Sequence, residues 1–136
     1  MESGTYIIDE IKFIPRSSLS IQLTALHRGE PDGGIGIPLI VTKDSSKYLV
    51  NFERAGRFRV LSEAFNELKK PYEKINNFLY GMLDSKYLRE HESSAKIFTN
   101  IPFDAEIKHY MVYSEFFVVD VLASEPPIIE VVENNQ

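Results

Sequence analysis

Alternation of apolar and polar residues with a period of two is the dominant pattern along the chain. In Ser18–Thr24 every second residue is apolar, and such a segment forms a strand with one face toward a core and the other toward water. Similar runs, rich in β-branched and aromatic residues, occupy 6–14, 35–42, 48–53, 58–61, 107–113, 116–122 and 128–132. Turn-forming residues separate these runs, so the pattern predicts an antiparallel meander.

Breaks within the pattern predict how some of the strands are connected. Only Ser114-Glu115 separates two of the most β-prone runs, which indicates a hairpin. Phe58–Leu61 is expected to continue the preceding strand after a break at Ala55-Gly56. Pro38 cannot donate a ladder hydrogen bond, so the run 35–42 is expected at a sheet edge or at a bulge. The segments 27–34 and 43–47 are expected to be loops.

Helix signals occur at two places. Ser62 precedes a segment with acidic residues at its start, lysines at its end and Pro71 after it, which predicts a helix over 62–70. Ser85 is a second candidate N-cap, for a helix over 85–92. Residues 71–83 fit either a helix or a strand, and Gly81 favours the strand.

These elements predict one α+β domain over residues 1–136, with 1–4 and 133–136 frayed at its ends. The expected architecture is a curved antiparallel sheet of about six to eight strands with one or two short helices. A chain of 136 residues buries about two-thirds of its extended surface, which is sufficient for one core without disulfide or metal crosslinks.

Composition excludes several classes of function. The chain has no cysteine, so a disulfide framework and thiolate chemistry are excluded. Its 15 basic and 20 acidic residues give a net charge of -5, which argues against a nucleic-acid partner. No apolar run approaches the ~20 residues that cross a bilayer, and no secretory signal pattern opens the sequence. We therefore expect a cytoplasmic protein with no membrane partner.

Candidate catalytic or metal-binding groups do not form a recognisable motif. The three histidines lack helical ligand spacing, and no phosphate-binding glycine motif is present. His109 is expected to be half-buried and hydrogen-bonded on the strand face that it shares with Met111. Asp120 interrupts an apolar strand, so we expect a partner for it or a bulge around it. The sequence thus predicts a protein that is not an enzyme and uses no metal or cofactor.

The carboxyl-terminal part of the chain is acidic. No Lys or Arg follows Lys108, and the last 28 residues contain five acids. If these acids share a face, they attract a basic partner and speed its association; the alternative is that they only keep a hairpin solvated. The candidate partner-binding residues are Glu115, Asp120, Glu125 and Glu130.

Several segments together resemble a group of small bacterial proteins, some of which look like immunity proteins of polymorphic or contact-dependent toxin systems. The resemblance lies in Ser17–Leu23, Phe58–Glu63, His109–Tyr113, Val119–Leu122 and Glu125–Ile129. It implies an α+β fold on a curved antiparallel sheet and a role in binding a toxin. No catalytic motif accompanies it.

Two functions follow as hypotheses. The first is a protein-binding module, an immunity protein that neutralises a cognate toxin through an acidic face and exists as a monomer or homodimer. The alternative is a small-ligand domain that uses aromatic residues on the concave face of the sheet. The candidate ligand-binding residues are Tyr48, Tyr80, His109 and Tyr113.

Overall fold

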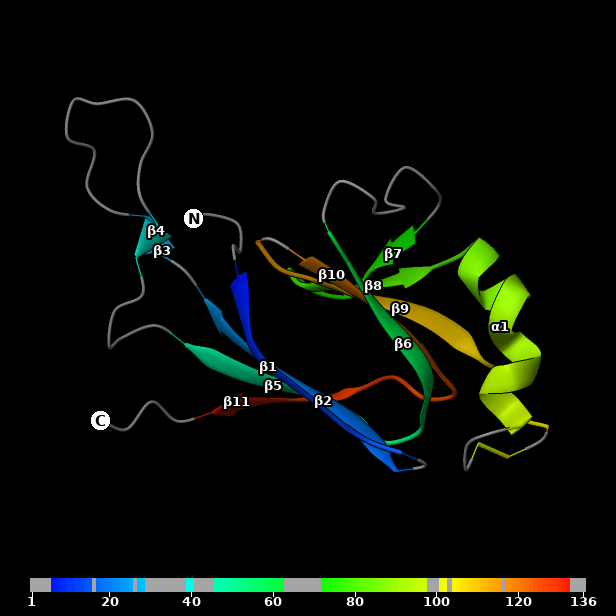
Figure 1. Cartoon of the computed structure of the whole chain (residues 1–136). Helices are drawn as coiled ribbons and strands as arrows, with labels where there is room; N and C mark the ends of the chain where they lie inside the picture. Colours follow the sequence, from blue (N-terminus) through cyan, green and yellow to red (C-terminus); the bar gives the residue numbers. More distant parts are fainter. Residues whose placement is uncertain are drawn as a thin grey trace.

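In the computed structural model, the described part of the chain consists mainly of antiparallel β-structure and contains one helix (Figure 1). It describes residues 6–15, 17–25, 27–28, 39–40, 46–62, 72–97, 101–102, 104–115 and 117–132. Within these ranges, two sheets of four and five strands face one another. A separate pair joins β3 (His27–Arg28) to β4 (Leu39–Ile40).

The first sheet has the order β1-β2-β5-β11. Its strands are β1 (Tyr6–Ile14), β2 (Ser18–Ala25), β5 (Lys47–Phe52) and β11 (Ile128–Val132). All neighbours are antiparallel, and a bulge shifts the β1–β2 register between Ile8 and Glu10. β11, the last strand in sequence, therefore forms one edge of this sheet, and β1 forms the other.

The second sheet has the order β6-β10-β9-β8-β7. Its strands are β6 (Ala55–Ser62), β7 (Tyr72–Lys74), β8 (Leu79–Met82), β9 (Lys108–Tyr113) and β10 (Phe117–Ala123). β10 and β9 form a hairpin in which Val118 pairs with Tyr113. Because β10 also pairs with β6, it lies inside the sheet with a strand on either side.

The main core fills the space between the two sheets. From the first sheet, β2 and β5 contribute fully buried side chains, and β9 and β10 contribute those of the second. These side chains are Leu19, Ile21, Leu23, Val50, Phe52, Val112, Val119 and Val121. Phe52 meets Tyr110 across the interface at 5.6 Å between ring centroids. The alternation of side chains on each strand thus produces a two-layer β-structure.

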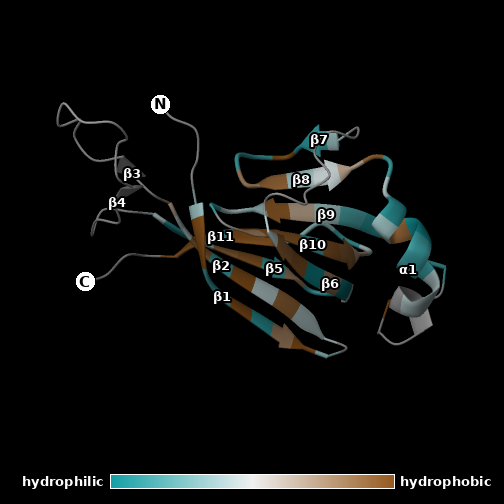
Figure 2. Cartoon of the chain, turned by 45° about the horizontal axis from the view of Figure 1, so that its top comes forward, coloured by the Kyte–Doolittle hydropathy of each residue, from teal (hydrophilic) through white to brown (hydrophobic). Residues whose placement is uncertain are grey.

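The opposite face of the second sheet is covered at one end by the helix α1 (Lys86–Ile97). Tyr87 of α1 packs in a cluster with Ile107 and Leu122. Figure 2 shows β10 largely hydrophobic and α1 largely hydrophilic. β10 is apolar on both faces because it has a layer on each side, whereas α1 buries only one stripe. No helix in the described ranges is long and apolar enough to cross a membrane.

The structure confirms many of the predicted elements. Strands form over most of 6–14, 18–24, 48–53, 107–113, 116–122 and 128–132. The 71–83 segment contains the strands β7 and β8, and Ser85 precedes the predicted second helix. The predicted helix over 62–70 lies largely outside the described residues, as do most of the strand over 35–42 and the loops over 27–34 and 43–47.

The prediction of one curved sheet is wrong in its architecture. We expected Phe58–Leu61 to continue the strand that ends near Glu53, but a turn at Glu53-Arg54 sends β6 into the other sheet. Ala55 lies within β6 and does not break a strand. Two packed sheets result, and the first sheet covers the face of β10 that is opposite α1.

We predict that truncating Phe52 to alanine weakens the contact between the sheets. Phe52 is fully buried, and a Phe→Ala change in a core costs about 3–5 kcal/mol of unfolding free energy. Phe13→Ala is the matched control, because Phe13 is 39% exposed on an edge strand; it should cost less than about 1.5 kcal/mol. Equilibrium unfolding in urea measures both, and equal losses would contradict the assignment of the core.

Candidate functional site

Four polar side chains form a hydrogen-bonded series on the face of the second sheet that α1 covers. Ser85 Oγ lies 2.6 Å from His109 Nδ1, and His109 Nε2 lies 2.7 Å from Asp120 Oδ1. Arg59 Nε donates to Asp120 Oδ2 at 2.8 Å. We call Ser85, His109, Asp120 and Arg59 the polar cluster. It links the start of α1 to three strands of the sheet.

The strand register places these residues together. Arg59 on β6 is directly opposite Asp120 on β10, and His109 on β9 is opposite Leu122, two residues further along β10. His109 and Asp120 are therefore diagonal neighbours on the same face. Ser85 joins them because it caps α1, where its Oγ accepts a hydrogen bond from Leu88 N–H at 2.9 Å.

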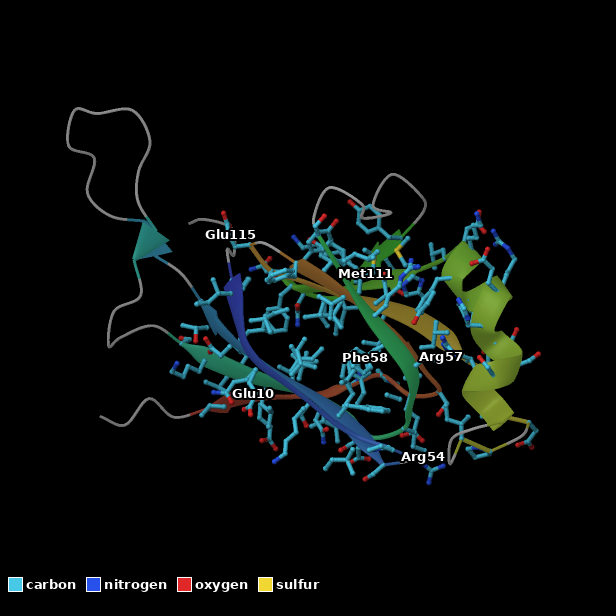
Figure 3. All side chains as sticks on the ribbon, viewed as in Figure 1. Glu10, Arg54, Arg57, Phe58, Met111 and Glu115 are labelled. Atoms are coloured by element: carbon cyan, nitrogen blue, oxygen red, sulfur yellow. The ribbon has the colours of Figure 1, made fainter. Side chains whose placement is uncertain are left out.

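The cluster is almost entirely withdrawn from solvent. His109 and Asp120 are each 1% exposed and Ser85 is 5% exposed. Arg59 keeps its side chain 33% exposed and lies over the Tyr87 ring, with Cζ 4.0 Å from the ring centroid. Burial raises the pKa of Tyr87, and the neighbouring Arg57 and Arg59 oppose this shift. Figure 3 shows Arg57 on the α1 side of β6 and Phe58 directed toward the first sheet.

The order Ser–His–Asp is that of a hydrolytic triad, but the surroundings give it a structural role. A nucleophilic serine must reach a substrate, whereas Ser85 is buried and its Oγ already binds the Leu88 amide. If the Ser85 hydroxyl donates to Nδ1, then Nε2–H donates to Asp120, and every member of the series is satisfied. The polar cluster thus joins α1 to the sheet without leaving a buried group unpaired.

The prediction that Asp120 contributes to an exposed acidic face is wrong. Asp120 is buried beside Arg59 and His109, as expected of an acid inside an apolar strand. Glu115 and Glu125 lie beyond opposite ends of β10, a strand of seven residues that spans about 20 Å. Glu130 lies on β11 in the other sheet. The four predicted partner-binding acids therefore do not form one surface.

The predicted aromatic ligand site is also divided. Tyr48 packs against the core between the sheets, where its ring lies 5.2 Å from Phe78. Tyr80 and Tyr113 make an edge contact at 5.3 Å on the opposite face of the second sheet. His109 belongs to the polar cluster. No single concave surface collects these four side chains.

A pocket of about 420 Å³ lies elsewhere, beside the ends of β8 and β9 and near Pro126. Tyr110, Glu73 and Glu106 line part of it, and Gly81 leaves space on its wall. Tyr110 is 5% exposed. Burial raises the pKa of its hydroxyl, and the negative charges of Glu73 and Glu106 raise it further. No local sequence pattern indicates this pocket, because Glu73, Gly81 and Tyr110 meet only through the pairing of β7, β8 and β9.

The strand β11 is an open edge of the first sheet. It pairs with β5 on one side, and no other described strand pairs with its outer side. Ile128 is 50% exposed and Val131 is 69% exposed. Glu130, at the centre of the strand, is its one charged residue. This combination of unpaired backbone and exposed apolar side chains is typical of an edge that accepts another strand.

Neither a metal-binding group among the described residues nor a known relative indicates what this chain does. In the described ranges, no group of three or more His, Asp or Glu side chains could hold a metal ion. Comparison with known proteins found no matching family model, curated protein or solved structure.

We predict that Ser85→Ala destabilises the fold by about 2–4 kcal/mol, because it removes an N-cap and leaves the buried His109 Nδ1 without its partner. Ser85→Thr should retain most of this stability. Ser93→Ala is the control, since Ser93 is exposed within α1, and it should change stability by less than about 0.7 kcal/mol. Urea unfolding measures the stability of all three variants. A loss of unfolding free energy below about 0.5 kcal/mol for Ser85→Ala would contradict the structural role of the polar cluster.

The raised pKa of Tyr110 predicts a loss of stability at alkaline pH. Well below about pH 10 the phenol is protonated in both states, so its contribution is complete. At higher pH the unfolded chain loses the proton first, and stability falls until the pH passes the folded-state pKa. Tyr110→Phe lacks this contribution and should lose less stability between about pH 9.5 and 11. Urea midpoints across this range measure the difference, and parallel curves would refute it.

Proposed function

We propose that this protein is a non-enzymatic binding module that holds an extended segment of a partner protein along β11. The observation that supports this most strongly is the open edge of β11, with Val131 69% exposed. A partner strand could pair with the backbone groups on the side of β11 where no described strand lies, and its side chains could cover Ile128 and Val131. Binding of this kind requires no reactive group.

The contrast between the two edges of the first sheet supports the choice of β11. β1 has a bulge between Ile8 and Glu10, and Lys12 lies within the strand. Bulges and lysines are the features that discourage strand addition at natural sheet edges. β11 pairs with β5 in continuous register over all five residues and contains no lysine or proline.

The single charge of β11 indicates the chemistry of the partner. Glu130 lies between Ile129 and Val131, so an added strand would present one residue opposite a carboxylate and apolar residues opposite its neighbours. An opposite charge directly across a strand pair is stabilising, and a like charge is destabilising. A partner segment with a basic residue between two β-branched residues therefore fits this edge.

A second copy of the chain fits less well. Glu130 is the middle residue of β11, and an antiparallel pair centred on it would place the two Glu130 carboxylates opposite each other. Like charges in that position oppose pairing. We therefore propose a different protein as the partner. The resemblance to immunity proteins suggests its class: a toxin with an extended basic segment.

The proposal is tested with a pair of blocked peptides, Thr-Val-Lys-Val-Thr and Thr-Val-Glu-Val-Thr. The folded protein should bind the lysine peptide about two- to fivefold more tightly, which corresponds to a cross-strand charge contribution of about 0.4–1 kcal/mol. The variant Glu130→Lys should reverse the preference. Isotope-edited NMR titration measures affinity and locates the shifted amides.

Substitution at the two edges supplies the control. Val131→Lys should weaken binding of both peptides, whereas Ile14→Lys, which adds the same charge to the exposed end of β1, should leave binding unchanged. Absence of binding to β11, or the same peptide preference in the wild type and Glu130→Lys, would contradict the proposal.

A further inference from the structure

The pocket beside β8 and β9 includes a tyrosine, Tyr110, in its lining. Tyr110 is 95% buried, and its side chain makes no hydrogen bond with another described residue. Its ring packs against Phe52 in the core, and this contact holds the ring in place. The Tyr110 hydroxyl is not among the fully buried polar atoms that lack a partner, so it is open to the pocket, and a ligand there could form a hydrogen bond with it.

Two carboxylates flank this hydroxyl. Glu73 and Glu106 both line the pocket, and both raise the pKa of Tyr110 through their negative charge. Neither forms an ion pair or a side-chain hydrogen bond with another described residue. Lys108 also lines the pocket, so these three charged side chains leave one net negative charge.

The remaining lining is largely apolar. Ile75, Met82, Leu83, Leu88, Ile107 and Pro126 complete most of the wall. The volume of about 420 Å³ lies within the range of natural small-molecule sites. Gly81 is opposite both Glu73 and Tyr110 in the strand pairing, and its missing side chain keeps this part of the wall open.

We propose that this pocket binds a small organic cation, namely a protonated amine attached to an apolar body. The ammonium group would lie between the Glu73 and Glu106 carboxylates and donate to the Tyr110 hydroxyl oxygen. The apolar part would contact Met82, Leu88 and their neighbours. This site is separate from the β11 edge, so either proposal can fail without the other.

The test uses three probes of equal size and different charge: 3-phenylpropylamine, 3-phenylpropanol and 3-phenylpropionate. The amine should bind saturably, at least about tenfold more tightly than the alcohol, because only the amine makes charge-assisted hydrogen bonds. The carboxylate should bind most weakly. NMR titration of the full chain gives the dissociation constants and locates the shifts around Tyr110 and Gly81.

Variants then distinguish the contribution of the carboxylate charges to binding from the contribution of the cavity. Glu73→Gln combined with Glu106→Gln should weaken amine binding about tenfold and leave binding of the alcohol nearly unchanged. Glu10→Gln, on β1 in the other sheet and visible in Figure 3, is the matched control and should leave amine binding unchanged.

Gly81→Val tests the cavity itself. A Cβ at Gly81 would meet only the Ile75 Cδ1 atom at 3.8 Å, an ordinary contact, and valine favours strands. This variant should stay folded and lose binding of all probes. Failure of the amine to bind folded wild-type protein, equal binding of the three probes, or unchanged binding in the folded Gly81→Val variant would overturn the proposal.

Discussion

The structure depends on the burial of β10 on both of its faces. One face, with Val119 and Val121, packs against the first sheet; on the other face, Val118 packs with Met111, and Leu122 packs with Tyr87 of α1. Asp120 occupies the middle of that second face. An isolated carboxylate there would be strongly unfavourable, and the contacts with Arg59 and His109 make it compatible with the core.

This arrangement couples local structure to tertiary packing. The Asp120–His109 pair extends to Ser85, whose hydroxyl also caps α1. The residue that starts the helix is therefore the residue that fixes it to the sheet. Removing one member of such a buried series costs more than its single hydrogen bond, because the remaining members stay buried without a partner.

Much of the local structure could be predicted from the sequence, and the pairing of the sheets could not. Alternation indicates the strand over Ser18–Thr24, and the short break at Ser114 indicates the hairpin. Both can be predicted because these patterns are local. The assignment of β6 to the second sheet depends on the turn at Glu53-Arg54 and on which layer offers a partner, and this information is spread over the whole chain. The apolar residues on both sides of Asp120 did indicate a partnered acid, but identifying Arg59 required the strand register.

Native-state amide hydrogen exchange tests most directly whether β10 is the centre of the fold. If its two covered faces hold the structure together, the amides of Val119 and Val121 should exchange only through global unfolding, with the free energy found in urea. The outward amides of the edge strand β11 should exchange much faster. Exchange of the β10 amides at a free energy well below that of global unfolding, while β2 stays protected, would contradict this account.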